Sequence, residues 1–397
     1  MNFPTDTSYF CDSAVDQGIL RQTAFNLRWA TVANDVIPLT AGEMDFPVAP
    51  PVREAIDRHV RNGYLGYCPA QGFESFREAI AADMTRRGIS SSADNILALD
   101  GAASALKATC LAVLDPGDVA ITFDPVDFLL PHCVELAGAT ALRCPVSPTT
   151  GKPDLSQLDS MITPATKALV ICNPHNPTGR VLRRAELISI ADLAEKNDLI
   201  IISDEVWSEI VLGPIPMTSI ASLSPEIGLR TVTISGFSKS DGLSGLRVGY
   251  AHCENKALFS KIMTASGALD TTGGATVLSQ IAAEAALLEG RDWRNDFIAH
   301  LKKVVSIAVN RLSSLPGVEC PMPEGTFLLF PKVTAFGLNS SELAELILKE
   351  AKVSVVPGDP RWFGPGSEGH LRFSVATSCE ILNEALNRIE TFWNQRA

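Results

Sequence analysis

The stretch Ile234–Tyr250 reads ISGFSKSDGLSGLRVGY and places Lys239 between a short apolar run and a glycine-rich loop that ends on Arg247. A lysine held near anion-binding groups and partly removed from water can lose its proton and form a Schiff base with a carbonyl compound. Arg247 offers a planar fork of donors that suits a phosphate. The alternative is a surface lysine in a Ser/Gly loop, because short motifs also arise by chance.

Outward from this stretch, short apolar runs alternate with helical patterns from about residue 96 onward. The predicted strands are ILALD, VAITF, ALRCPV, KALVIC, LIIIS, TVTIS and LRVGYAH. Strands of continuous Val, Ile and Leu with helices between them predict a mostly parallel sheet flanked by helices on both faces. The predicted fold class is therefore α/β, and ligands of such sheets bind at the carboxyl ends of the strands.

The pattern changes after about residue 255, where long helices are predicted at 265–288, 293–315, 341–349 and 379–393 with short strands among them. We expect three parts: an N-terminal arm that also contributes to the small domain (1–45), a large cofactor-binding domain (46–285), and a smaller α+β C-terminal domain (286–397).

Composition excludes several classes of protein. With 397 residues, 46% of them hydrophobic, the chain can bury a large core. Lys and Arg number 33 against 45 Asp and Glu, and no basic run is interleaved with aromatics, so nucleic acid is not an expected partner. No apolar run approaches the roughly 20 residues of a membrane span. The N-terminus lacks a secretory signal, and nine scattered cysteines without a CxxC pair indicate a cytoplasmic protein with no metal site.

Unusual residues follow two of the predicted strands. Ala102 and Ala103 open a helix, and backbone N–H groups at a helix N-terminus favour an anion. The motif Asn173–Gly179, NPHNPTG, contains two Asn-Pro units that fix an extended loop and turn Asn176 into the site. A proline-rich turn without chemistry is the alternative for this motif.

Two charged residues complete the set. Asp204 follows the predicted strand LIIIS, where a carboxylate can pair with a protonated pyridine nitrogen or can simply cap a helix. Arg372 lies in the predicted strand HLRFS, and it can bind an amino-acid carboxylate through two parallel hydrogen bonds or form a structural ion pair. With Lys239 and Arg247, these residues point to pyridoxal 5′-phosphate (PLP) as the cofactor.

A family resemblance rests on eight motifs that occur in order along nearly the whole chain: GYCPAQG, DGAASAL, NPHNPTG, SDEVW, FSKSDGLSGLRVGY, EGTFLLFP, VVPG and HLRFS. In them the sequence resembles fold type I PLP-dependent enzymes of the class I/II aminotransferase superfamily. The resemblance implies an amino-acid aminotransferase in which Lys239 is the Schiff-base residue and shuttles a proton between the substrate Cα and C4′ of the cofactor. It also implies a homodimer with the active site at the subunit interface.

The resemblance assigns two kinds of role to the site residues. The cofactor-binding residues would be Tyr67 (reaching the phosphate of the partner subunit), Ala102, Ala103, Asn176 (to O3′), Asp204 (to the pyridine nitrogen), Trp207, Ser238 and Arg247. The substrate-binding residues would be Gly42, Asp127, Phe128 and Arg372.

Three departures from the family pattern bear on the reaction. Asp127 stands where an aromatic ring usually stacks on the cofactor, so either Phe128 rotates in or a carboxylate faces the ring, which would suit a cationic substrate. Trp207 replaces a tyrosine, and its indole N–H can donate to O3′ but cannot form a phenolate. A serine usual three positions before the lysine is absent, and Ser235 or Ser238 would contact the phosphate instead.

A second resemblance concerns residues 29–67, with DVIPL, EMDFPVAPPV and GYLGY, which are similar to the cystathionine β-lyase branch of MalY/PatB type. It leaves β- or γ-elimination as an alternative reaction, or cyclising dehydration of a basic hydroxylated amino acid. Both reaction types begin with Lys239 taking the Cα proton. A cofactor-binding regulatory module is a further alternative, and the intact lysine argues against it.

Overall fold

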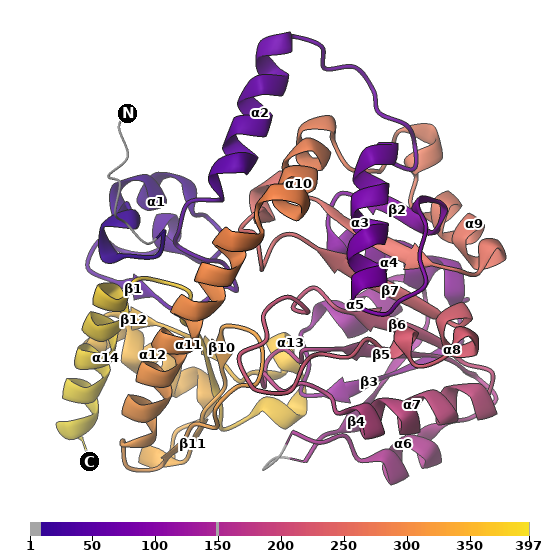
Figure 1. Ribbon diagram of the computed structural model, residues 1–397. Helices are drawn as coiled ribbons and strands as arrows, with labels where there is room; N and C mark the ends of the chain where they lie inside the picture. Colours follow the sequence, from indigo (N-terminus) through magenta and orange to yellow (C-terminus); the bar gives the residue numbers. More distant parts are fainter. Residues whose placement is uncertain (1–8, 148–150, 397) are drawn as a thin grey trace.

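The largest sheet of the computed structural model, which describes residues 9–147 and 151–396, has seven strands in the spatial order β2-β8-β7-β6-β5-β3-β4 (Figure 1). Its strands are β2 (Ile96–Leu99), β3 (Val119–Asp124), β4 (Thr140–Pro145), β5 (Thr166–Cys172), β6 (Ile200–Asp204), β7 (Thr231–Gly236) and β8 (Gly249–Cys253). All neighbours run parallel except β8, which is antiparallel to both β2 and β7. The predicted mostly parallel sheet is confirmed.

Both faces of this sheet are buried, and strand β5 shows how. Its residues Val170 and Cys172 belong to the main hydrophobic core, whereas Leu169 and Ile171 between them belong to a second core on the other face. Successive side chains of a strand point to opposite faces, so a strand covered on both sides needs a continuous apolar run. This requirement explains why polar and apolar residues do not alternate along the sequences of the predicted strands.

The helices of this part of the chain are α2 (Pro50–Asn62), α3 (Glu74–Arg86), α4 (Ala102–Val113), α5 (Leu129–Leu136), α6 (Leu155–Met161), α7 (Arg184–Lys196), α8 (Pro225–Leu229), α9 (Lys256–Ala265) and α10 (Val277–Glu289). Helix α2 illustrates the local signals for a helix. It begins with two prolines, which suit the first turn, and ends at Gly63, whose φ of 76° is the left-handed conformation that glycine adopts most easily.

The rest of the chain builds smaller sheets beside long helices (Figure 1). Strands β10 (Leu328–Leu329), β14 (Leu371–Ser374) and β13 (Val356–Pro357) form one sheet, and β9 (Val318–Glu319) pairs with β11 (Lys332–Val333). The helices are α1 (Gln17–Thr23), α11 (Arg291–Ser313), α12 (Ser340–Ala351), α13 (Pro360–Phe363) and α14 (Cys379–Asn394). Strand β1 (Ile37–Pro38) pairs with β12 (Val353–Ser354), so the beginning of the chain lies against its last third. The division at 45/46 and 285/286 stays a prediction.

The continuous helix expected at 265–288 is wrong. Helix α9 ends at Ala265 and α10 begins only at Val277, with a loop between them. Gly267 and Gly274 have φ values of +71° and +106°, and a side chain on Gly273 would collide with the Ser266 carbonyl oxygen. Three glycines in eight residues therefore interrupt the helix that the apolar pattern alone predicts. Within the described residues, no helix is long and apolar enough to cross a bilayer.

Candidate active site

A cleft of about 670 Å³ opens at the carboxyl ends of the central strands, a volume within the roughly 300–1,000 Å³ of small-molecule sites. The predicted residues that line it are Ala102, Ala103, Asp127, Asn176, Asp204, Trp207, Ser238, Lys239 and Arg247. They come from segments that follow different strands, and the sheet brings those strand ends to one edge. Gly42 and Arg372 do not line the cleft, but each bonds a residue that does.

Lys239 lies in the short segment between β7 and the Arg247 loop. Its Nζ donates a hydrogen bond to the Gly42 carbonyl at 2.9 Å and lies 5.2 Å from the centre of the Trp207 ring. Burial lowers the pKa of this amine, and the carboxylate of Asp127 opposes the shift. A lowered pKa increases the fraction of neutral, nucleophilic amine. Gly42 is thus a partner of the lysine, while the neighbouring backbone at Thr40 contacts Arg372.

Asp204 ends strand β6 with its carboxyl group in the cleft. The backbone N–H of Val206 donates to its Oδ1 at 3.1 Å. Burial raises the pKa of the carboxyl to about 7, against the opposing effect of that hydrogen bond. A buried carboxyl without an ion-pair partner among the described residues fits a ligand with a protonated nitrogen, because such a cation would restore the charged form.

The start of helix α4 and Arg247 form a cradle for an anion. Gly101 precedes the helix with a φ of +117°, and a Cβ there would lie 2.9 Å from Nη2 of Arg247. A Cβ on Gly249 would lie 2.5 Å from the amide nitrogen of Ala102. These two glycines allow the arginine and strand β8 to approach the helix N-terminus, where N–H groups and the guanidinium face the same space. Arg247 makes no ion pair within the described ranges, so it remains available for a phosphate.

Arg372 is a buried cation that makes no ion pair with any residue that the structure describes. Its Nη1 donates to Oδ1 of Asn176 at 3.3 Å and its Nη2 to the Thr40 carbonyl at 3.2 Å, whereas Nε has no partner among the described residues. The guanidinium lies 5.0 Å from the centre of the Phe363 ring. Burial lowers the pKa of the guanidinium. A carboxylate of a ligand would supply the missing charge and hydrogen bonds.

Asn176 joins Arg372 to Asp127. Its Nδ2 donates to Oδ2 of Asp127 at 2.8 Å while its Oδ1 accepts from the arginine. Asp127 also accepts the backbone N–H of Leu129 at 3.1 Å, which anchors the start of helix α5. The carboxylate that replaces the usual aromatic residue therefore orients Asn176.

The expectation for Phe128 is not met. Its side chain is 37% exposed and does not line the cleft. Its ring packs edge-on against Trp362 at 5.7 Å, and its backbone N–H donates to the Trp362 carbonyl. This contact holds Phe128 outside the cleft, and Asp127 lines the cleft instead.

Ser235 and Tyr67 also lie away from the cleft. Ser235 is buried and donates to the Glu205 carbonyl at 3.2 Å, which leaves Ser238 as the serine that lines the cleft. Tyr67 is 94% exposed in the loop between α2 and α3 and reaches no residue of the cleft.

The cleft also contains residues that the sequence did not point to. They include Thr23, Phe25, Asn26 and Glu43. The first three follow helix α1 or end it, in a segment with too little periodicity to predict its position. Glu43 follows Gly42 directly, and the carbonyl–lysine contact next to it is a tertiary feature that no local motif signals.

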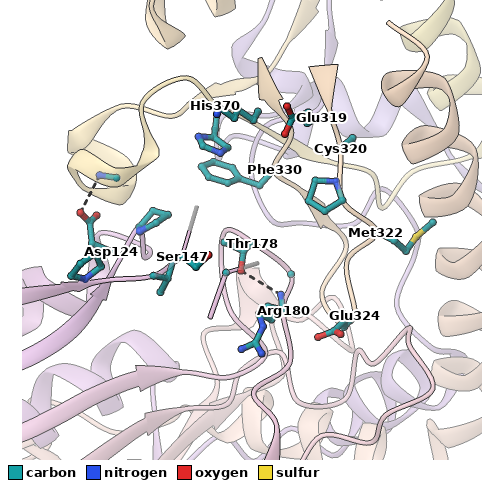
Figure 2. A pocket seen from close by; sticks show the side chains of 18 residues that line it. Asp124, Ser147, Thr178, Arg180, Glu319, Cys320, Met322, Glu324, Phe330 and His370 are labelled. Carbon is teal, nitrogen blue, oxygen red and sulfur yellow. Dashed lines mark hydrogen bonds between the residues drawn. The ribbon is translucent and has the colours of Figure 1, made fainter. Parts of the chain in front are cut away.

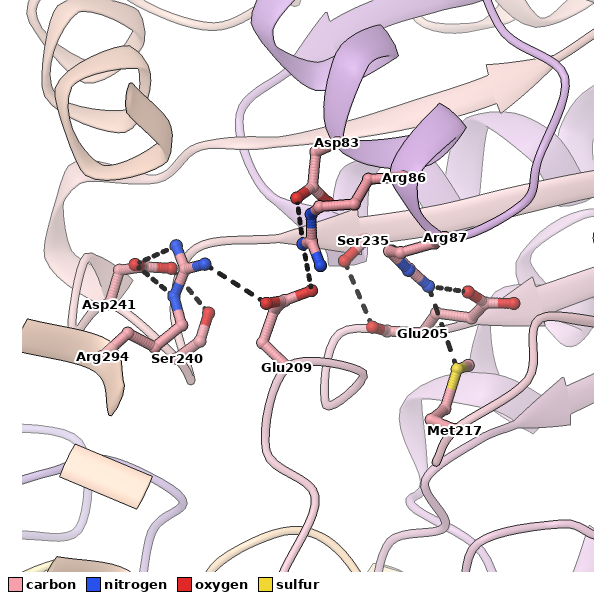
Figure 3. A network of polar contacts seen from close by, with 10 residues as sticks. All are labelled: Asp83, Arg86, Arg87, Glu205, Glu209, Met217, Ser235, Ser240, Asp241 and Arg294. Atoms are coloured by element: carbon pink, nitrogen blue, oxygen red, sulfur yellow. Dashed lines mark hydrogen bonds and ion pairs between the residues drawn. The ribbon is translucent and has the colours of Figure 1, made fainter. Parts of the chain in front are cut away.

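Two arginines, Arg87 and Arg294, form ion pairs with residues close in sequence to Asp204 and Lys239 (Figure 3). Arg87 pairs with Glu205, which is fully buried and also accepts the hydroxyl of Ser219 at 2.6 Å. Arg294 of helix α11 pairs with Asp241 at 2.7 Å. Glu205 follows Asp204, and Asp241 is two residues beyond Lys239, so these pairs anchor the backbone close to both residues.

We expect replacement of Arg87 by methionine to destabilise the protein by about 3–5 kcal/mol, because the charge of Glu205 would remain buried without an ion-pair partner. Chemical denaturation followed by circular dichroism measures this loss. Arg61→Met is the matched control, since its ion pair with Asp57 is exposed and exposed pairs contribute about 1 kcal/mol or less. Equal losses in the two variants would contradict a stabilising role for the buried pair.

A second cavity of about 650 Å³ shares no lining residue with the cleft (Figure 2). Its labelled walls are Asp124, Ser147, Thr178, Arg180, Glu319, Cys320, Met322, Glu324, Phe330 and His370. Here His370 stacks on Phe330, with ring centres 4.6 Å apart, and Asp124 accepts the Gly366 N–H at 3.0 Å. None of the predicted site residues lies in this cavity, so we place the active site in the cleft that contains Lys239.

The anion cradle, the partly buried lysine and the carboxyl for a protonated nitrogen together define a PLP site on an α/β fold. The profile of the family "Aminotransferase class I and II" matches residues 34–389. The aspartate aminotransferase of Thermotoga maritima is 37% identical over 366 residues, which are 91% of this chain and 92% of the relative. The chain therefore belongs to the class I and II aminotransferases and is a PLP-dependent enzyme.

Solved structures give the same result. An aromatic aminotransferase from Pyrococcus horikoshii OT3 superposes with a TM-score of 0.86 at 32% identity and covers 92% of this chain and 97% of its own. A PLP-bound putative aminotransferase from Clostridium difficile 630 superposes with a TM-score of 0.89 at 26% identity, covering 97% of this chain and 100% of its own. The predicted fold, enzyme class and cofactor are confirmed.

Proposed function

We propose that this aminotransferase binds its amino-acid substrate through the α-carboxylate on Arg372 and moves the Cα proton with Lys239. The observation that supports this most directly is the buried guanidinium of Arg372, which makes no ion pair among the described residues and contacts Asn176 of the lysine cleft. Two charge-assisted hydrogen bonds from one arginine orient a carboxylate more narrowly than a single contact does. The substrate Cα would thereby face Lys239.

For the cofactor, we assign the phosphate to Arg247, Ser238 and the backbone amides of Ala102 and Ala103. Asp204 would hold the protonated ring nitrogen, and Asn176 and Trp207 would flank the ring. PLP supplies an electron sink for the charge that develops at Cα. The chain's own contribution is a lysine whose pKa is lowered by burial, so that it can accept the proton and return it at another carbon.

We expect Asp204 to make the cofactor-free protein less stable as pH rises. Its folded-state pKa is about 7, above the ordinary value of 3.8, so the folded state holds a proton that the unfolded state has lost. Stability should fall as pH rises from the ordinary value towards 7. We expect the cofactor-free protein and its Asp204→Asn variant to have similar melting temperatures at the low end of this pH range. At the high end, the natural protein should melt at a lower temperature than the variant. Parallel curves would contradict the assignment.

We also propose a homodimer in which Tyr67 reaches the phosphate of the partner subunit. Its side chain is 94% exposed beside Tyr64 (84%) and Leu65 (59%), and large apolar side chains grouped on a surface are typical of an interface. A cytoplasmic location is a further proposal, supported by nine cysteines that are all free thiols.

The test of the proposed reaction is the half-reaction of the holoenzyme with a panel of amino acids and no acceptor. Transamination converts PLP into pyridoxamine phosphate and releases a 2-oxo acid. The similarity of residues 29–67 to the cystathionine β-lyase branch makes elimination the rival reaction, which releases ammonia and keeps PLP. Ammonia in stoichiometric yield, with PLP retained, would overturn the proposal.

A further inference from the structure

Within one subunit, the described residues in and beside the cleft offer no free cation for an acidic substrate side chain. Among the described residues that line the cleft, the basic ones are Lys239 and Arg247. In the proposed function, the first reacts with the cofactor, the second binds its phosphate, and Arg372 beside the cleft binds the α-carboxylate. A carboxylate on the substrate side chain would find no remaining positive partner among these residues.

Two carboxylates remain, in contrast. In the proposed function Asp204 would pair with the ring nitrogen. Asp127 and Glu43 also line the cleft, and neither makes an ion pair within the described parts of the chain. The hydrogen-bond donors to Asp127 are the neutral groups of Asn176 and Leu129. Glu43 accepts a long bond, 3.4 Å, from the amide of Asn26. Neutral donors leave the negative charge of both groups in place.

The positions of these carboxylates relate them to the substrate. Glu43 follows Gly42, whose carbonyl bonds Lys239, and Asp127 bonds Asn176, which in turn bonds Arg372. One carboxylate thus neighbours the lysine and the other neighbours the carboxylate-binding arginine. Both raise the pKa of Lys239, which places their charges within electrostatic reach of that amine.

We propose that this aminotransferase selects amino-acid donors with a positively charged side chain, and that Asp127 and Glu43 are the residues that determine this specificity. The inference rests on the proposed function, since it assumes that the three cations are occupied by cofactor and α-carboxylate. A cationic side chain would pair with the two carboxylates, whereas an acidic one would meet like charge in a partly desolvated cleft.

The experiment compares donors of similar length with positive, neutral and negative side chains: ornithine, norvaline and glutamate. With the holoenzyme, kcat/KM of the half-reaction should be at least about tenfold higher for ornithine than for norvaline, and lowest for glutamate. In Glu43→Gln the ornithine-to-norvaline ratio should fall roughly tenfold, and Asp127→Asn should lower it as well. Glu43→Gln is the cleaner variant, because Asp127 also anchors Asn176 and helix α5.

Binding alone provides a second readout. The α-methyl forms of the three amino acids have no Cα proton and cannot be turned over, so calorimetry with the holoenzyme measures their dissociation constants. Tightest binding of α-methylornithine, weakened in Glu43→Gln, supports the inference even if the products show elimination rather than transamination. Equal or tighter binding of α-methylglutamate, or a charge preference unchanged in both variants, overturns it.

Discussion

Replacing Lys239 with alanine is expected to abolish turnover, with a loss on the order of 10³-fold or more, because both proton transfers at the substrate would use this amine in the proposed function. Its Nζ lies in the cleft at 2.9 Å from the Gly42 carbonyl, and its neighbour Trp207 is also in the cleft wall. Borohydride reduction should attach the cofactor covalently to the natural protein and not to the variant. Turnover and cofactor absorbance spectra measure the two effects.

The control for this variant is Lys167→Ala, which removes an exposed lysine whose Nζ donates to the Pro164 carbonyl far from the cleft. It should leave turnover and covalent attachment unchanged. A Lys239→Ala protein that kept the activity of the natural protein would contradict the placement of the active site.

The second large effect is expected for Arg372→Ala. Hydrogen bonds to charged groups contribute about 1.5–3 kcal/mol each, so the loss of two from the substrate carboxylate should lower kcat/KM roughly 10²- to 10⁴-fold. Arg372→Lys should recover only part of this activity, because an ammonium lacks the planar fork. Steady-state kinetics with the best donor of the panel measures both variants.

Arg361→Ala is the matched control for Arg372, since Arg361 belongs to the nearby helix α13 and pairs with Asp359 at the surface. Its kcat/KM should stay within about twofold of that of the natural protein, as is usual for surface substitutions. Full activity in Arg372→Ala would show that the substrate carboxylate binds elsewhere.

Much of the fold could be predicted because it depends on local signals. Continuous apolar runs such as LIIIS mark strands buried on both faces, and such strands need helices between them. The one clear error, a helix across 266–276, arose because an apolar composition was given more weight than Gly267, Gly273 and Gly274. Glycine at positive φ ends a helix whatever the hydrophobic pattern suggests.

The candidate site was predicted less evenly. Lys239, Asp204 and Arg247 could be predicted as site residues, because each has a side chain suited to a cofactor and follows a predicted strand. The ends of these strands meet at one edge of the sheet, where the three residues line the cleft. Phe128 was misplaced and Glu43 was missed. Both depend on which way a side chain points once distant segments have packed.

The sequence by itself determined the α/β fold, the cofactor and the lysine to which we assign the proton transfers, because residue type and strand order suffice for these. Only the tertiary structure decided which side chains line the cleft. Trp362, 234 positions after Phe128, holds that ring outside, while Asn176 turns Asp127 inward. Contacts between segments so far apart have no local signature, and they decide which charges face the substrate.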